Sequence, residues 1–139
     1  MSALEDVLYE TRNGVAWITI NRPDRLNAFR MRTIEDLIAA FRRSWSDPDA
    51  GAVVLTGAGE KAFCAGGDQK ERYETGSYGE NPVGLYEAYN LHRLMRDLPK
   101  PTIAAVNGYA IGGGHILHVL CDVSIAAEHA RFGQAGPRV

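Results

Sequence analysis

Residues 102–114, TIAAVNGYAIGGG, join a short apolar run to a cluster of three glycines. The same arrangement occurs at residues 52–67, AVVLTGAGEKAFCAGG, where an apolar run leads to a second glycine cluster. A short, continuous apolar run predicts a β-strand that is buried on both faces. Glycine lets the chain bend sharply and lets a ligand approach the backbone closely. The sequence therefore predicts two similar units, each a buried strand followed by a glycine turn.

The N-terminal segment predicts a β-hairpin. Val7–Thr11 and Val15–Ile20 are rich in β-branched and apolar residues, and Arg12-Asn13-Gly14 separates them. An Asn-Gly pair between two such runs favours a hairpin, because a type I′ turn needs a positive φ at both central residues.

The rest of the chain alternates helix and strand patterns. Apolar residues at helical spacing after Pro23 predict an amphipathic helix that ends near Pro48. Residues 69–81 are polar and predict a long, mobile loop, and residues 131–139 match no element. The other expected elements are a helix within residues 82–98, a strand over Thr102–Val106, a helix that ends near Cys121 and a strand over Val123–Ala127. This order predicts an α/β layered domain.

The composition is that of an ordinary folded domain, with 139 residues, 45% of them hydrophobic and 23% charged. The 15 Lys and Arg residues against 17 Asp and Glu residues give no basic excess for nucleic acid. No apolar run reaches the roughly 20 residues that cross a bilayer, and residues 1–10 lack the pattern of a secretory signal. The cysteines Cys64 and Cys121 are too few for a disulfide scaffold. We therefore expect a cytoplasmic protein with no nucleic-acid or membrane partner.

The two glycine turns suggest a chemical role if they converge in space. Backbone N–H groups at a helix start have no partner inside the helix and point at whatever lies there. Two such donors could hold one oxygen that develops negative charge, and removing one donor of this kind costs about 2.7–4 kcal/mol of transition-state stabilisation. The alternative is that the glycines only permit tight turns and close helix–strand packing.

Five motifs carry a resemblance to a known family. They are Asn21-Arg22-Pro23, Leu26–Phe29, Phe63–Asp68, Pro99-Lys100-Pro101 and Asn107–Gly114. In their order and spacing they resemble the crotonase (enoyl-CoA hydratase/isomerase) superfamily over essentially the whole chain. The resemblance implies a spiral of ββα units, coenzyme A thioester substrates, no tightly bound cofactor, and assembly as a homotrimer or a dimer of trimers. It also implies that residues 1–139 are the N-terminal part of one acyl-CoA-binding domain. In that case the second half of the domain and the trimerisation helices would follow residue 139.

The resemblance assigns roles to individual residues. It implies an oxyanion hole made by the backbone N–H groups of Gly67 and Gly113, and it places Tyr78 in the substrate pocket. The residues implied in substrate or coenzyme A binding are Arg25, Ala28, Ala65, Asp68, Gln69, Lys70 and Arg72. Lys70 and Arg72 would belong to a loop that closes over the acyl-CoA.

Two positions depart from the hydratase pattern. The catalytic glutamates of hydratases correspond here to Ile116 and Gly136, so water addition by a glutamate pair is not available. Gly114–His118 and Phe132–Pro137 are instead similar to the 1,4-dihydroxy-2-naphthoyl-CoA synthases of menaquinone biosynthesis. That subgroup implies a bicarbonate base at the position of Gln134 and Gly136.

The subgroup resemblance implies a Dieckmann- or Claisen-type ring closure. A thioester enolate, held by the two amides, would attack a second carbonyl of the same substrate. Tyr9–Asp24 and Arg96–Pro101 resemble the ring-opening 2-ketocyclohexanecarboxyl-CoA hydrolases at least as well, and that reaction runs the related chemistry in reverse. Another family member, or a non-catalytic acyl-CoA-binding subunit, is also compatible with the loss of both glutamates.

Three other interpretations of the motifs are weaker. Gly57–Ala62 matches the G-x-G-x-x-A dinucleotide fingerprint, but that fingerprint needs a helix directly after it. His115, His118 and Asp122 share a helix face, yet the segment is apolar and a fourth ligand is missing, so we expect packing histidines and no metal site. Cys64 could be a nucleophile, but no His–Asp pair lies near it in the sequence.

Overall fold

The computed structural model describes residues 3–76 and 86–134. Eight strands form two sheets, a larger one in the order β1-β2-β3-β5-β7 and a smaller one in the order β4-β6-β8. The strands are β1 (Val7–Arg12), β2 (Val15–Ile20), β3 (Ala52–Gly57), β4 (Ala62–Cys64), β5 (Thr102–Val106), β6 (Tyr109–Ile111), β7 (Val123–Ala126) and β8 (Phe132–Gly133). The helices are α1 (Met31–Ser46), α2 (Gln69–Thr75), α3 (Tyr86–Asp97) and α4 (Gly113–Leu120), with a 3-10 turn over Pro23–Arg25.

The predicted N-terminal hairpin is confirmed. β1 and β2 pair antiparallel, with Arg12 opposite Val15. Asn13 and Gly14 have φ values of 51° and 79°, which are the two positive φ values that a type I′ turn requires. The other strand pairs of the large sheet are parallel.

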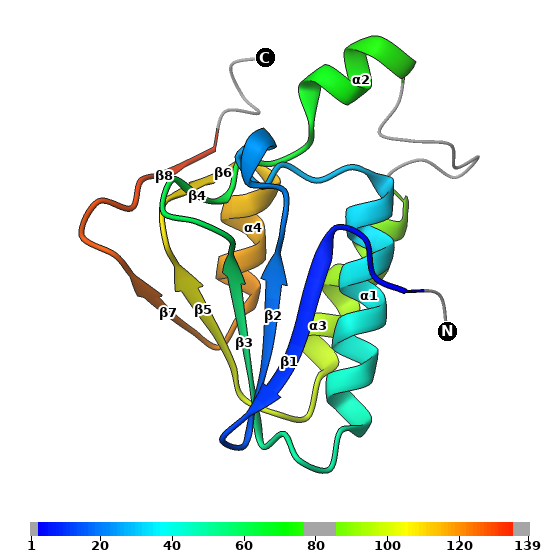
Figure 1. The fold of residues 1–139 in the computed structure, drawn as a ribbon, viewed down its shortest axis with the longest axis vertical. Coiled ribbons are helices and arrows are strands. Elements are labelled where there is room, and N and C mark those ends of the chain that lie inside the picture. Colours follow the sequence, from blue (N-terminus) through cyan, green and yellow to red (C-terminus); the bar gives the residue numbers. More distant parts are fainter. Residues whose placement is uncertain (1–2, 77–85, 135–139) are drawn as a thin grey trace.

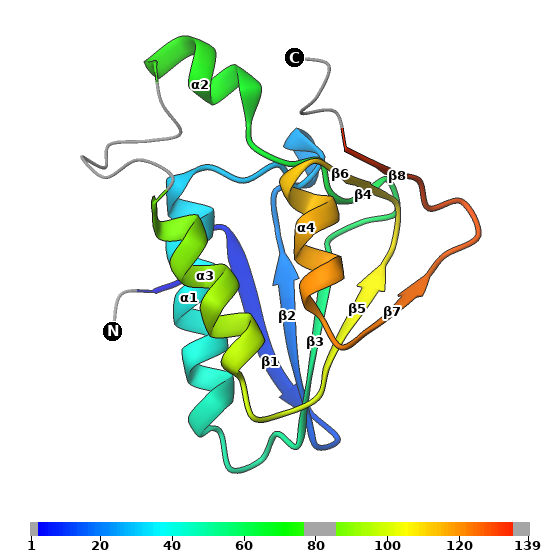
Figure 2. The same ribbon diagram turned by 180° about the vertical axis from the view of Figure 1, so that it is seen from behind.

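Helices α1, α3 and α4 cover one face of the large sheet (Figures 1 and 2). Every second residue of β2 points to that face, and Ala16, Ile18 and Ile20 are fully buried there. The amphipathic helix α1 contributes Leu37 and Phe41, which are also fully buried. Burial of this apolar surface, at about 25 cal/mol per Å², is the main force that holds helices and sheet together.

The chain repeats one pattern of connection. β3 and β5 lie in the large sheet, each is followed by a short strand of the small sheet, and a helix comes next. The small sheet lies across the end of the large sheet at which β2, β3 and β5 finish (Figure 1). This is the expected spiral of ββα units, and it brings the turns after β4 and β6 to the same edge.

Two loop predictions are wrong. Within the predicted loop 69–81, residues Gln69–Thr75 form helix α2, and residues 77–81 lie outside the described part of the chain. The Asp68 side chain accepts from the amides of Lys70 and Glu71, and Gly76 ends the helix at a φ of 77°. These are ordinary helix start and stop signals. Within residues 131–139, Phe132–Gly133 form β8, because they pair with Ala110 and Ile111 of β6.

The prediction of strands buried on both faces is also wrong for β5. Thr102, Ala104 and Val106 are buried beneath the helices, whereas Ile103 and Ala105 are only half-buried on the opposite face. No helix among the described residues covers that opposite face (Figures 1 and 2). Among the described residues, no helix is both long and apolar enough to span a membrane.

Candidate active site

The two glycine turns lie side by side at the edge of the small sheet. β4 and β6 pair in parallel, with Ala62 opposite Tyr109 and Cys64 opposite Ala110. The chain leaves both strands at the same end, so the turn at 65–67 meets the turn at 112–114. A Cβ built on Gly66 would lie 3.5 Å from the backbone nitrogen of Gly113. The turns that the sequence could only suggest as neighbours are therefore in contact.

Gly66 and Gly114 must be glycine for this contact to form. Gly66 has a φ of 92°, and a Cβ there would lie 2.9 Å from the Ile111 carbonyl oxygen. A Cβ on Gly114 would overlap the Cys64 carbonyl group. A Cβ atom essentially never tolerates contacts this short. The two glycines therefore allow the start of α4 to pack directly against the end of β4.

Within the described part of the chain, the amides of Gly67 and Gly113 are not used in backbone pairing. Gly67 forms an isolated parallel bridge with Phe29. In that bridge the Phe29 amide donates to the Gly66 carbonyl at 2.8 Å, and the Asp68 amide donates to the Phe29 carbonyl at 2.8 Å. Gly113 is the first residue of α4, where an amide has no partner inside the helix. Among the residues that the structure describes, neither amide donates to a backbone carbonyl.

Phe29 lines the space between the two turns. Phe29 is 8% exposed, and a Cβ on Gly113 would lie 2.5 Å from its Cε1 atom. The segment before Phe29 runs alongside the first glycine turn, because the Ala65 amide donates to the Leu26 carbonyl at 3.1 Å. Ala28 and Ala65, both predicted to contact substrate, are thus brought to the glycine turns.

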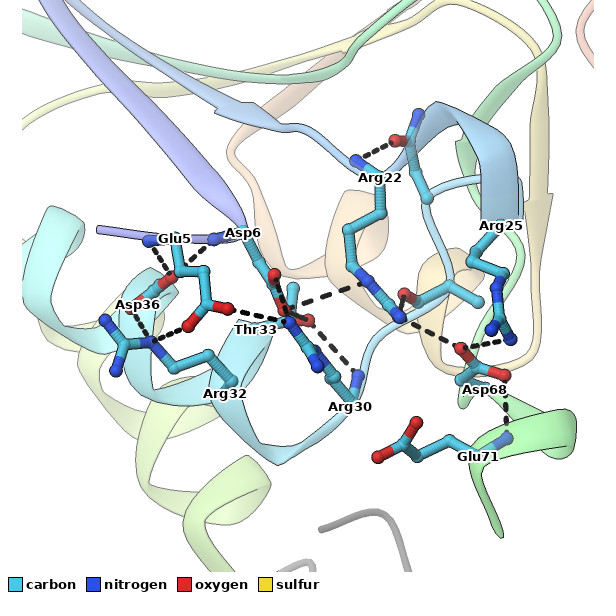
Figure 3. Close-up of polar contacts among 12 residues, drawn as sticks. Glu5, Asp6, Arg22, Arg25, Arg30, Arg32, Thr33, Asp36, Asp68 and Glu71 are labelled. Carbon is cyan, nitrogen blue, oxygen red and sulfur yellow. Dashed lines mark hydrogen bonds and ion pairs between the residues drawn. The ribbon is translucent and has the colours of Figure 1, made fainter. Parts of the chain in front are cut away.

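Asp68 connects the first glycine turn to helix α2 and to two arginines (Figure 3). Its Oδ1 atom accepts from the amides of Lys70 and Glu71, both at 3.1 Å. Its Oδ2 atom lies 3.1 Å from Nη1 of Arg22 and 3.5 Å from Nη1 of Arg25. Burial raises the pKa of Asp68, but the Glu71 amide, the hydrogen bond from Arg22 and the charges of both arginines outweigh it, so the pKa is lowered. The carboxylate is therefore held in its charged form.

Helix α2 places the polar residues that follow. Gln69, Lys70 and Arg72 are exposed on α2, which projects beyond the small sheet in Figure 1. Nε2 of Gln69 donates back to the Gly67 carbonyl at 3.3 Å. Lys70 and Arg72 therefore belong to a helix rather than to the predicted loop.

Of the remaining predicted residues, Gln134 is described and Tyr78 and Gly136 lie outside the described residues. Oε1 of Gln134 lies 3.8 Å from the position of a Cβ on Gly112, so its amide group is next to the second glycine turn. Ile116 is on α4, three residues after Gly113, and is 37% exposed. Ile116 is thus an apolar residue close to the second glycine turn, because its amide donates to the Gly112 carbonyl at 3.1 Å.

The alternative sites do not gain support. β3 is followed by the strand β4 rather than by a helix, so the dinucleotide interpretation of Gly57–Ala62 is wrong. Burial raises the pKa of Cys64 to about 12, which keeps its thiol neutral and unsuited to nucleophilic attack.

The two helix α4 histidines contact each other. Nε2 of His118 lies 2.8 Å from Nδ1 of His115, and Nδ1 of His118 lies 2.9 Å from the Ser124 hydroxyl. Asp122 turns away from them and accepts from the Thr102 amide at 2.9 Å. Among the described residues, no three His, Cys, Asp or Glu side chains are grouped as metal ligands would be.

Three residues that build the site have no role that the sequence motifs predict. Arg22, Asn27 and Phe29 all belong to motifs that were recognised, yet only the structure shows what they touch. Asn27 is fully buried and donates to the carbonyls of Ala58 and Ala62 at 3.0 and 2.8 Å. A buried polar residue must find partners, but the sequence does not name them.

Comparisons with known proteins identify the family and the fold of this chain. Residues 10–139 match the enoyl-CoA hydratase/isomerase family. The fold is similar to an enoyl-CoA hydratase/isomerase from Xanthobacter autotrophicus Py2, with 36% identity and a TM-score of 0.89 over 98% of this chain and 51% of that one. It is also similar to an enoyl-CoA hydratase from Bacillus anthracis, with 34% identity and a TM-score of 0.86 over 96% of this chain and 52% of that one. An enoyl-CoA hydratase from Mycobacterium avium subsp. paratuberculosis K-10 shares 30% identity, with a TM-score of 0.83 over 99% of this chain and 50% of that one. The chain therefore spans about half the length of these relatives.

Proposed function

The chain belongs to the enoyl-CoA hydratase/isomerase family, and on that premise we propose that the full-length protein stabilises the enolate of a coenzyme A thioester during ring closure. The reaction would be of the Dieckmann or Claisen type, as in 1,4-dihydroxy-2-naphthoyl-CoA synthases. Residues 1–139 would supply the oxyanion site of a single acyl-CoA-binding domain. The observation that carries the proposal is the contact between two glycine turns whose amides are not used in backbone pairing.

The chemistry needs such a site. A proton next to a thioester carbonyl is weakly acidic, so its removal at neutral pH requires that the enolate oxygen be held by fixed dipoles. The Gly67 amide would provide one donor. The Gly113 amide would provide the second, strengthened by the dipole of α4, which starts at that residue. Arg25, Lys70 and Arg72 would supply positive charge to the phosphates of coenzyme A.

The substitutions at the glutamate positions favour ring closure over hydration. Ile116 cannot transfer a proton, and it stands close to the second glycine turn. Bicarbonate would supply the missing general base, and the Gln134 amide group beside Gly112 fits its need for a hydrogen-bond donor. By the same resemblance, Gly136 would lie at the bicarbonate position and Tyr78 would contact the substrate. Lyase activity, acyl-CoA binding and a homotrimer or dimer of trimers follow from the same proposal.

A second candidate is ring opening of 2-ketocyclohexanecarboxyl-CoA. The segments Tyr9–Asp24 and Arg96–Pro101 resemble those hydrolases at least as well, and both directions use the same oxyanion site. Assays of the full-length protein with o-succinylbenzoyl-CoA and with 2-ketocyclohexanecarboxyl-CoA separate the two. Turnover of the first supports ring closure, turnover of the second supports hydrolysis, and tight binding of both without turnover supports a non-catalytic subunit.

A matched pair of variants tests the oxyanion role of Gly113. Gly113→Ala and Gly113→Pro both add a Cβ against the Phe29 ring, but only proline removes the N–H group. Proline is also tolerated at the first position of a helix. We expect kcat of Gly113→Pro to be about 100- to 1,000-fold below that of Gly113→Ala, which is the effect of losing one oxyanion donor. Equal kcat values for the two variants would contradict the assignment.

A further inference from the structure

Arg22 is a buried arginine to which the proposed chemistry gives no task. It is 9% exposed, and Nη1 donates to the Ala28 carbonyl at 2.6 Å and to Oδ2 of Asp68 at 3.1 Å. Its Nε atom lies 3.8 Å from Oδ2 of Asp6. Burying a guanidinium group is costly unless it is paired and hydrogen-bonded, so its two short contacts indicate where it acts.

Those contacts fall on the two segments that pair with each other at the first glycine turn. Ala28 immediately precedes Phe29, and Asp68 immediately follows Gly67. Phe29 and the turn are themselves joined by the hydrogen bonds from Phe29 to Gly66 and from Asp68 to Phe29. One guanidinium group thus ties together the two segments whose pairing leaves the Gly67 amide free.

The Gly67 N–H group shares a planar peptide unit with the Gly66 carbonyl, and that carbonyl accepts from the Phe29 amide at 2.8 Å. The Phe29 amide in turn shares a peptide unit with the Ala28 carbonyl, which Arg22 holds. Asp68 anchors the chain on the other side of Gly67. The Asp68 amide binds Phe29, Oδ1 binds the first turn of α2, and Oδ2 binds Arg22. Because an oxyanion donor must lie within a few tenths of an ångström of its place to act, this anchoring bears directly on catalysis.

The geometry points to Arg22 and Asp68 as a positioning pair, which we infer holds the Gly67 amide in the direction that an oxyanion hole requires. The inference rests on the proposed function of Gly67. Neither side chain would touch the reacting atoms. They would act through the backbone of the glycine turn.

Arg22 also lies next to a second group of charged and polar residues, formed by Asp6, Arg30 and Thr33 (Figure 3). Asp6, next to Arg22, accepts from Nε of Arg30 at 2.9 Å and from the Thr33 hydroxyl at 2.7 Å. Arg30 immediately precedes α1 and Thr33 lies in its first turn, so the pair is connected to a main helix of the core. Arg25 also faces Asp68, but its Nη1 atom is 3.5 Å away and its side chain is 32% exposed. Arg22 is therefore the dominant partner.

Arg22→Gln and Asp68→Asn in the full-length protein test the inference. The first readout is the split between kcat and KM, since misplacing an oxyanion donor lowers kcat rather than substrate binding. We expect kcat to fall by about 10- to 100-fold, as for small displacements of catalytic groups, with KM changed little. The double variant is expected to be no slower than the slower single variant, because both residues act through one pair. Arg22→Lys keeps the positive charge but loses the forked geometry of the guanidinium group. Its kcat should lie between those of the wild type and Arg22→Gln.

The second readout is the infrared carbonyl frequency of a bound, unreactive acyl-CoA thioester. Hydrogen bonds from the oxyanion site lower this frequency, so we expect it to move in Arg22→Gln back toward its value in solution. Arg32→Gln is the matched control, because Arg32 also pairs with a buried carboxylate, at 2.9 Å from Asp36, but on α1 and away from the glycine turn. Its kcat and its carbonyl frequency are expected to equal those of the wild type.

The outcomes separate the inference from the proposed function. If the wild-type protein leaves the carbonyl frequency unchanged, the oxyanion role of the turn is wrong. If the wild type shifts the frequency and the folded Arg22→Gln and Asp68→Asn variants shift it equally, with unchanged kcat, the positioning pair is wrong. Loss of folding in both variants, seen by circular dichroism, would also overturn it, because the pair would then support the fold rather than the amide.

Discussion

Asp6, Asp36 and Asp68 are carboxylates in the interior, each less than 5% exposed. Each has several donors, and those of Asp36 are the amides of Glu5 and Asp6 at 2.8 and 2.7 Å. Burial raises the pKa of Asp6, but hydrogen bonds from Arg30 and Thr33 and the charges of Arg30 and Arg22 outweigh it, so the pKa is lowered. At the scale of single residues, the buried carboxylates therefore link the N-terminal segment, α1 and the first glycine turn.

The lowered pKa of Asp6 predicts acid sensitivity. A carboxylate with a pKa below its unfolded value stabilises the folded state fully above about pH 4, and that contribution is lost as the pH falls through the folded-state pKa. Asp6→Asn is expected to lower the free energy of unfolding at neutral pH by about 1.5–3 kcal/mol. It should also flatten the fall in stability below about pH 4. Urea unfolding across this pH range measures both effects.

Asp24→Asn is the control for this prediction, since Asp24 is exposed on the 3-10 turn. Its stability should follow the wild-type pH curve within experimental error. An unchanged pH dependence in Asp6→Asn would show that the charged network does not contribute to acid stability.

At the scale of elements, α2 depends on its two ends. It has only seven residues, which is too short for a helix to be stable by itself. Asp68 supplies the N-terminal cap, and Gly76 ends the helix with its amide donating to the Arg72 carbonyl at 2.8 Å. The orientation of Lys70 and Arg72 therefore depends on these caps.

Gly76→Ala tests the C-terminal end. Nothing lies within 4 Å of a Cβ at this position, so the cost is the left-handed φ of 77° alone. We expect α2 to open more easily by about 1 kcal/mol, and the amides of residues 72–76 should exchange about fivefold faster in hydrogen-exchange experiments. Gly51→Ala, whose Cβ would meet nothing closer than 3.8 Å, is the matched control and should leave this exchange unchanged.

At the scale of the whole molecule, one face of the large sheet is apolar and is covered by no helix among the described residues. The pairing registers place Trp17, Val54, Ile103 and Val123 in one row across β2, β3, β5 and β7. Ile125 lies in the next row, and Val123 and Ile125 are 54% and 64% exposed. Contiguous apolar surface of this kind drives association in water, and β7 also presents an edge of the described sheet.

A polypeptide of residues 1–139 is therefore expected to self-associate through this face. Val123→Lys with Ile125→Lys should shift it toward monomer in sedimentation equilibrium experiments, because charged side chains oppose burial. Val119→Lys is the matched control, since Val119 is 62% exposed but lies on α4 instead of the sheet. A monomeric wild type at concentrations of about 100 μM, in the weak range for association, would contradict the prediction.

Local patterns in the sequence predict much of the fold. The Asn13-Gly14 turn, helix α1 and the strands of the large sheet depend on residues that are near one another in the chain, where φ preferences and apolar spacing act directly. The motifs likewise pointed to the family. The caps of α2 were also present in the sequence, but the polar composition of residues 69–81 concealed them.

Only the tertiary structure decided how the site is built. β4, β6 and β8 have two or three residues each, too few for a periodic pattern, and they exist because each pairs with a distant partner. The contact between the turns at Gly66 and Gly113 and the pairing of Arg22 with Asp68 join residues more than 40 positions apart. Such contacts depend on how the sheets and helices pack together, which no local propensity encodes. The sequence alone determined which turns and charges are present, and packing determined which of them meet.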